Sequence, residues 1–198
     1  MKVSERAPVV LCAVLASPSL TSGVRTRQAL ARLGEVLQVS EIRVVNLLNM
    51  PSQDFQDMAL VGADEQVWEE SRPSITSGVV GADLLLAAWG LADLTGPATT
   101  HRRDQIRWFR ELAAGLGHED VLTVGGAPRH PSRWHRLVSD RHGWQEPGSS
   151  TDRLRAVLMS VPLHRVSPAP VLPGPGQLST GKPRLSDPCG SLGEHKFE

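Results

Sequence analysis

The sequence predicts an α/β fold, a three-layer sandwich with a mainly parallel central sheet. Two observations lead to this prediction: short continuous apolar runs occur along the chain, and segments of helical periodicity alternate with them. A continuous apolar run is typical of a strand that is buried on both faces. Strands that alternate with helices favour a parallel sheet covered on both sides. With 198 residues, the chain is long enough for one domain with a sizeable core.

Four strands and three helices are expected in this order of alternation. The predicted strands are the short apolar runs 9–15, 42–45, 84–89 and 121–124. The predicted helices are 24–38, 64–70 and 101–116, of which the first and last repeat apolar side chains at helical spacing. In such sheets ligands bind beyond the carboxyl ends of the strands, so the residues that follow each strand are the first candidates for a functional site.

The composition changes at residue 161. Residues 161–198 hold seven of the 15 prolines and few large apolar side chains. Closely spaced prolines interrupt helices and are excluded from the interior of sheets. We therefore predict a folded domain over residues 1–160 and a Pro/Gly-rich, disordered tail over 161–198. The alternative for the tail is a proline-rich docking ligand.

The charge is neutral in total and uneven in distribution. The chain has 21 basic and 21 acidic residues, which excludes a generally basic coat. Residues 129–142 nevertheless hold four Arg and three His against Asp140, whereas residues 50–83 hold seven acidic residues and one Arg. A basic segment of this kind suits the phosphates of a nucleic acid. The alternative is a solvated, Arg-rich helix.

Several classes of protein are disfavoured. Cys12 and Cys189 lie in different surroundings, which argues against a disulfide framework and a Cys-rich zinc site. His130, His135 and His142 lack Cys or carboxylate partners at metal-binding spacing, so no metal and no other cofactor is expected. The start of the chain lacks the pattern of a signal peptide, and no apolar run could span a bilayer. We expect a cytoplasmic monomer with no membrane partner.

Polar or Pro/Gly-rich segments follow all four predicted strands. Four motifs stand out there: Ser17-Pro18-Ser19, Val45-Asn46-Leu47, Leu86-Ala87-Ala88-Trp89-Gly90 and Arg129-His130-Pro131-Ser132. Together they resemble an uncharacterised bacterial family with an Asn-Pro-Ser motif. Their order and their placement at strand ends also resemble the uracil-DNA glycosylase superfamily. The resemblance covers about residues 8–142 and implies the same α/β fold, DNA as the partner and a metal-independent hydrolysis of the bond between base and sugar.

The resemblance implies a role for individual residues. Asn46 would read the edge of a flipped base, and Trp89 would lie beside that base. His130 would stabilise negative charge on the departing base. Ser132 would hold a phosphate within a basic surface formed with Arg129, Arg133 and Arg136, and Trp134 would be the wedge that fills the gap in the duplex. The alternatives are ordinary ones: a turn cap for Asn46 and a core side chain for Trp89.

One position departs from the superfamily. The water-activating residue, an acid or Asn in the well-known branches, is Ser17 here. A serine positions water but is a poor base, so another carboxylate is needed unless stabilisation of the leaving group suffices. Asp54 is the first candidate and Asp57 the second. The alternative for Asp54 is an N-cap of a helix that begins at Phe55.

The substrate is predicted from a small side chain. Ser19 occupies the place where the uracil-specific branch has a Tyr that blocks the carbon-5 methyl group of thymine, and the chain has no Tyr at all. We therefore expect a carbon-5-modified pyrimidine, such as hydroxymethylcytosine or its glucosylated form. Because such bases occur in bacteriophage genomes, a role in anti-phage defence follows. Two alternatives stay open: a catalytically inactive nucleic-acid-binding module, and a nucleoside or nucleotide hydrolase.

Overall fold

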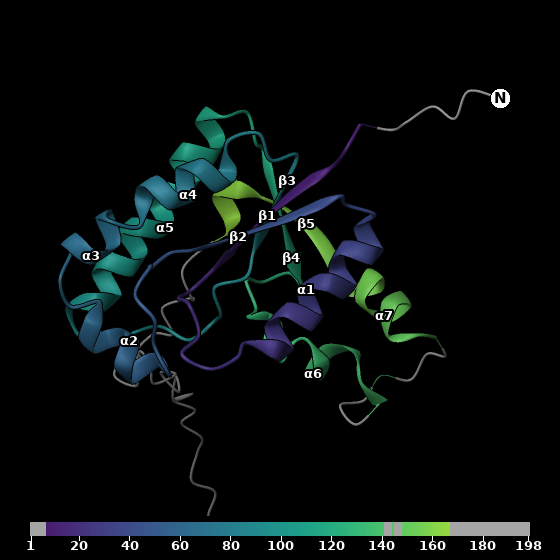
Figure 1. Cartoon of the computed structure of the whole chain (residues 1–198), viewed down its shortest axis with the longest axis horizontal. Coiled ribbons are helices and arrows are strands. Elements are labelled where there is room, and N and C mark those ends of the chain that lie inside the picture. Colours follow the sequence, from purple (N-terminus) through teal and green to yellow (C-terminus); the bar gives the residue numbers. More distant parts are fainter. Residues whose placement is uncertain (1–6, 141–143, 145–147, 167–198) are drawn as a thin grey trace, which may run out of the picture.

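The structure is a computed structural model that describes residues 7–140, 144 and 148–166. Five strands form one sheet in the order β2-β1-β3-β4-β5 (Figure 1). The first four strands are parallel, and β5 runs antiparallel to β4. Their bounds are β1 Val10–Leu15, β2 Glu41–Asn46, β3 Leu84–Ala87, β4 Asp120–Val124 and β5 Leu158–Pro162. The predicted α/β class with a mainly parallel sheet is confirmed.

Helices cover both faces of the sheet, which gives three layers (Figure 1). One face carries α2 (Phe55–Val61), α3 (Gln66–Glu69), α4 (Arg72–Val79) and α5 (Pro97–Gly115). The other face carries α1 (Val24–Leu37), α6 (His135–Val138) and α7 (Ser150–Val157). Two short 3-10 turns, η1 (Pro131–Arg133) and η3 (Leu163–Arg165), complete the elements. No described helix combines the length and the apolarity needed to cross a membrane.

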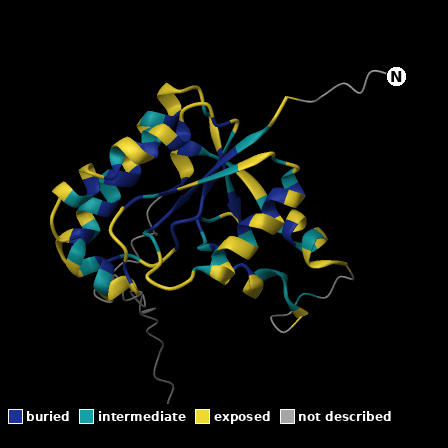
Figure 2. Ribbon diagram, viewed as in Figure 1, coloured by how far each residue is buried: buried dark blue, intermediate teal, exposed yellow. Residues whose placement is uncertain are grey.

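The core consists of two apolar clusters, one on each face of the sheet, and Figure 2 shows the buried residues concentrated there. The cluster under α2–α5, called here the α5-face cluster, contains Trp68, Trp89 and Phe109. The cluster under α1 and α7, the α1-face cluster, contains Leu33 and Trp134. Alternate residues of β1 enter the two clusters, which explains why the sequence of this strand is continuously apolar.

The sequence analysis did not predict α4, α7, β5, η1 or η3, and it offered helices at the places of α2 and α6 only as alternatives. The start of α7 does carry a signal, because the Ser149 side chain accepts a hydrogen bond from the backbone of Asp152 while the Asp152 carboxylate accepts one from the backbone of Ser149. The folded domain continues past residue 160, the predicted boundary, into the described residues 161–166. Leu163 and Val166 are buried in the domain, and Pro162 ends an edge strand, a place where proline is tolerated. The rest of the predicted tail, 167–198, lies outside the described residues.

The strand order creates a natural place for a ligand. The chain leaves β1 towards β2 on one side, and β3 lies on the other side of β1. This is a switch point of a doubly wound sheet, and ligands of such sheets bind in the crevice outside the carboxyl ends of the strands there. A ligand is therefore expected to contact the residues that follow β1 and β3.

Candidate functional site

A cavity of about 580 Å³ opens at the carboxyl ends of β1 and β3. Four stretches of chain that are far apart in sequence line it, namely parts of 16–19, 52–58, 89–92 and 129–137. Three of these stretches contain the motifs singled out in the sequence. The structure thus brings together most of the predicted site residues: Ser17, Ser19, Asp54, Trp89, Arg129, His130, Ser132, Arg133 and Arg136.

Two serines, Ser17 and Ser52, line one side of the cavity. The Ser17 and Ser52 hydroxyl oxygens lie 2.5 Å apart, and Ser52 is only 8% exposed. The backbone extends the strand pairing here, since Ser19 forms a parallel bridge with Ser52 and the Ser52 amide donates to the Pro18 carbonyl at 3.2 Å. Sequence reasoning missed Ser52, because its link to Ser17 depends on how the two loops pack.

Asp54 has the role foreseen as its alternative. Its Oδ1 atom accepts hydrogen bonds from the amides of Gln56 at 2.9 Å and Asp57 at 3.0 Å, so it caps α2. The cap does not remove Asp54 from the cavity lining, and Oδ2 takes no part in it. Asp57, the second candidate for a catalytic base, instead accepts from the Gln53 amide at 3.0 Å and does not line the cavity.

Gly90 lines the cavity, and the side chains of Phe55 and His130 lie next to it. Gly90 has φ +89°, a backbone conformation that L side chains rarely adopt, and its amide donates to the Pro128 carbonyl. A Cβ atom on Gly90 would lie 3.5 Å from the Phe55 ring and 3.9 Å from the His130 Cβ. Phe55 is 40% exposed although it is aromatic and lines the cavity. It was not singled out in the sequence.

His130 is held in one orientation. Its Nδ1 lies 2.9 Å from the Ser132 hydroxyl and accepts the Ser132 backbone amide at 3.4 Å. An accepting Nδ1 assigns the proton of the neutral ring to Nε2. Burial lowers the pKa of His130, and the positive charge of Arg133 lowers it further. The lowered pKa favours the neutral ring, and in that ring an accepting Nδ1 leaves the N–H donor at Nε2.

Trp134 corrects the predicted set. Its side chain is 2% exposed and packs in the α1-face cluster, and its indole N–H donates to the Arg129 carbonyl at 2.8 Å. A wedge must be free to enter a duplex, so this buried side chain is not one. The physical reason is that η1 and α6 turn Trp134 towards α1, while the exposed Arg133 and Arg136 face the cavity.

Asn46 is not among the residues that line the cavity. It ends β2, four residues after Ile42, which packs against the α1-face cluster, and strand alternation places both side chains on that face. Its Oδ1 atom is buried and has no hydrogen-bond partner within the described part of the chain. The role of Asn46 in reading a base stays a prediction.

Trp89 is a core residue that also borders the cavity. It is 1% exposed and meets Phe109 edge to face, with ring centroids 5.8 Å apart and planes at 78°. The alternative given for it in the sequence, a core side chain, is thus confirmed. Its position ties the cavity wall to the α5-face cluster.

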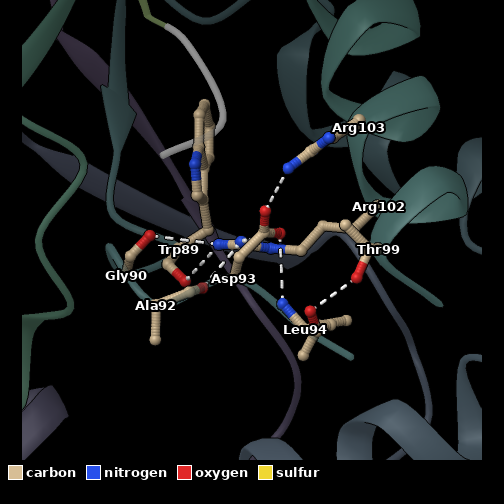
Figure 3. A network of polar contacts seen from close by, with 8 residues as sticks. All are labelled: Trp89, Gly90, Ala92, Asp93, Leu94, Thr99, Arg102 and Arg103. Carbon is tan, nitrogen blue, oxygen red and sulfur yellow. Dashed lines mark hydrogen bonds and ion pairs between the residues drawn. The ribbon is translucent and has the colours of Figure 1, made fainter. Parts of the chain in front are cut away.

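A buried arginine supports the wall next to Trp89 (Figure 3). Arg102 of α5 is 1% exposed and donates to the carbonyls of Ala92 at 2.8 Å and Gly90 at 3.1 Å. Asp93 lies 3.6 Å from it and also pairs with Arg103. Burial lowers the pKa of Arg102, and the Asp93 carboxylate opposes this. Sequence reasoning missed Arg102, although it falls on the buried stripe of the helix with Ala98, Ile106 and Phe109.

The described residues contain no group of three or more His, Cys, Asp or Glu side chains that could hold a metal ion. No known family model matches the chain, and no curated protein or solved structure is significantly similar to it. The class of the protein therefore rests on the fold and the cavity alone: it is an α/β protein with a cavity at the switch point of its sheet. The site combines a neutral imidazole donor, a pair of hydroxyls, a carboxylate, an exposed aromatic ring and three arginines.

Proposed function

We propose that the protein is a DNA glycosylase of the uracil-DNA glycosylase type, which flips a base into the cavity and hydrolyses its bond to the sugar. The observation that supports this most is the placement of His130, whose Nδ1 accepts the Ser132 amide and leaves Nε2 as the donor of the neutral ring, at the same cavity as an arginine-rich rim. A base presents carbonyl oxygens that accept from an N–H group, and the strand that carries it presents phosphates to arginines.

His130 has the chemistry for stabilising the leaving group. As the glycosidic bond breaks, its electron pair moves to the base and negative charge develops on a carbonyl oxygen. A donor already oriented by Ser132 lowers the energy of that charge without having to reorient during the reaction. A neutral ring donates without giving up its proton, which leaves the base to take a proton from water later.

The other side of the cavity is suited to water. The Ser17–Ser52 pair offers hydroxyl groups that position a water molecule, and Asp54 offers a carboxylate. In the proposed step the water oxygen attacks the sugar carbon that the base leaves, and its proton passes to Asp54. The water thus supplies the hydroxyl group that replaces the base. Ser17 positions and does not act as the base.

Room and polarity support a modified pyrimidine as substrate. The cavity of about 580 Å³ falls within the range of pockets for whole small molecules, roughly 300–1,000 Å³. Phe55 offers a face on which a flat base stacks, worth about 1–3 kcal/mol per base. Ser19, a small hydroxyl side chain at the cavity, leaves space for a carbon-5 substituent such as a hydroxymethyl or glucosylated hydroxymethyl group. Such substrates extend the proposal to anti-phage defence.

The test is release of a base. Duplexes that each carry one candidate base are incubated with the protein, then treated with alkali to cut abasic sites. We expect cuts with a carbon-5-modified pyrimidine, and a loss of about 10²–10³-fold in rate for His130→Ala. His164→Ala is the matched control, because His164 is exposed on η3 and does not line the cavity. Absence of cuts with every base would exclude the glycosylase.

A second candidate function follows from one observation. The Ser17 hydroxyl, at the position expected to activate water, is already engaged by Ser52 at 2.5 Å. A protein that kept the cavity and lost the reaction would bind nucleic acid without cutting it. In the same assay, DNA that is bound and not cut, with equal affinity for wild type and His130→Ala, favours this binding module.

A further inference from the structure

A second cavity, of about 680 Å³, lies beside the first on the α1 face. Residues of α1, η1, α6 and α7 line it. The two cavities share Ser132, and the stretch 131–139 separates them as a ridge. Successive side chains of this ridge go to different sides: Arg133 and Arg136 line the first cavity, whereas His135 and Val138 line the second. The two cavities are therefore neighbours across one short helical ridge.

The second cavity is a basic groove. Arg25, Gln28 and Arg32 line it from one face of α1, at the three- and four-residue spacing that aligns side chains along a helix. Both arginines are exposed, and neither forms an ion pair with any residue that the structure describes. The opposite wall carries Arg153, which pairs at 2.6 Å with Asp140, the one carboxylate in the lining. Two guanidinium groups are thus left without a counter-ion in the described part of the chain.

We propose that this groove binds the phosphodiester backbone of the nucleic-acid strand whose base enters the first cavity. Guanidinium groups match phosphate oxygens in geometry. Arg25 and Arg32 lie seven residues apart on α1, about two helical turns or ~10.5 Å, which corresponds to roughly three nucleotides of a strand at ~3.4 Å each. The ridge is about one helix wide, ~10 Å, so a strand crosses it within roughly three nucleotides of ~3.4 Å each. The statement that a base of this strand enters the first cavity rests on the proposed function. The affinity of the groove for phosphates does not depend on it.

The test uses the double variant Arg25→Ala/Arg32→Ala and a fluorescently labelled, unmodified single strand of about 20 nucleotides. Anisotropy titrations at several salt concentrations give the affinity and its salt dependence. We expect the double variant to bind at least tenfold more weakly. Its plot of log affinity against log salt should be shallower by about 1.4, since each lost phosphate contact removes about 0.7 for a single strand.

The matched control is Arg107→Ala/Arg165→Ala, which removes the same charge from exposed positions outside both cavities. It should bind within about twofold of the wild type, because screening limits the reach of charges to roughly 10 Å at 0.1 M salt. Thermal unfolding of both double variants checks that the fold is retained. A groove variant with the affinity and salt slope of this control overturns the proposal, and so does a wild type that does not bind the strand.

The outcome separates this proposal from the glycosylase. If base release is observed while the groove variant binds like the control, the proposal that the groove binds phosphates is wrong and the proposed function stands. If no base is released from any DNA while the groove variant still loses affinity for the single strand and part of its salt dependence, the proposed function is wrong and the proposal that the groove binds phosphates stands.

Discussion

The two helical layers of this protein differ in their cores and in their charge. The α5-face cluster contains large aromatic side chains, Trp68, Trp89 and Phe109, and the surface outside it carries the acidic patch Asp64, Glu65, Glu69 and Glu70. The α1-face cluster is mainly aliphatic, with Trp134 as its large ring, and arginines line the groove outside it. A formal charge of zero thus results from two layers of opposite character. The net charge of a chain does not tell which partner one face of it suits.

The first cavity forms where these layers meet. Phe55, Met58 and Trp89 reach it from the α5 side, while Arg136 and Leu137 reach it from the α1 side. An apolar, aromatic wall against a basic wall fits a ligand that is flat on one side and anionic on the other. A nucleotide has this character, and neither layer alone would recognise it.

The largest expected effect tests the α1 layer. Trp134→Ala should lower the free energy of unfolding by about 3–5 kcal/mol, because it removes a fully buried ring and leaves a cavity. Urea denaturation followed by circular dichroism measures this loss. Trp108→Ala is the control: Trp108 is partly exposed and stacks under Arg72, with the guanidinium 5.2 Å from the ring centroid. Its cost should be about 1 kcal/mol.

The same two variants also test the prediction from the sequence that Trp134 is the wedge that enters the duplex. If Trp134→Ala unfolds at the urea concentration of Trp108→Ala and only base release is lost, Trp134 acts as the wedge after all. The α1 layer would then be less firmly packed than the α5 layer.

A smaller effect is expected for the arginine pair that flanks Asp93 in the α5 layer. Arg102→Met should cost about 1–3 kcal/mol, because the buried carbonyls of Gly90 and Ala92 lose their donor. Arg103→Met is the matched control, since Arg103 pairs with the same Asp93 but its side chain is 35% exposed. It should cost less than about 1 kcal/mol. Equal values in thermal unfolding would mean that Asp93, and not the carbonyl contacts, is what Arg102 stabilises.

The sequence predicted the elements whose signal is local. The run 9–15 and the leucines of 24–38 predicted β1 and α1 almost to the residue, because periodicity is read within one segment. The cap by Asp54 was likewise given, as the alternative to its predicted catalytic role, since a cap depends on residues within three positions. The strand-end rule then located three of the four stretches that line the cavity.

The placement of side chains could not be predicted from the sequence where it depends on packing between distant segments. Nothing in the order of residues 129–136 shows that Trp134 faces α1 while Arg133 and Arg136 face the cavity. Asn46 was assigned from its position at a strand end, but the alternation set by Ile42 places it on the face of the sheet under α1. The pairing of Ser17 with Ser52 joins loops 35 residues apart and has no local signal.

The smallest expected effect on stability comes from a glycine at the meeting point of the two layers. Gly90→Ala should cost about 1–2 kcal/mol, the strain of an L residue at positive φ. Gly117→Ala provides the same strain without the cavity, because Gly117 has φ +90° and no atom lies within 4 Å of its added Cβ. Thermal unfolding should place the two variants within about 0.5 kcal/mol of each other.

Their base release should differ, because only at Gly90 does the new methyl group come into van der Waals contact with side chains that line the cavity. The Cβ would lie 3.5 Å from the Phe55 ring and 3.9 Å from the His130 Cβ, which are ordinary contact distances, so any shift of the loop that relieves the positive-φ strain is passed on to these two side chains. A misplacement of about 1 Å at a reacting group costs up to ~10²-fold in rate, so we expect at least a tenfold loss for Gly90→Ala and none for Gly117→Ala. Equal rates in the two variants would mean that Phe55 and His130 do not act together on the base.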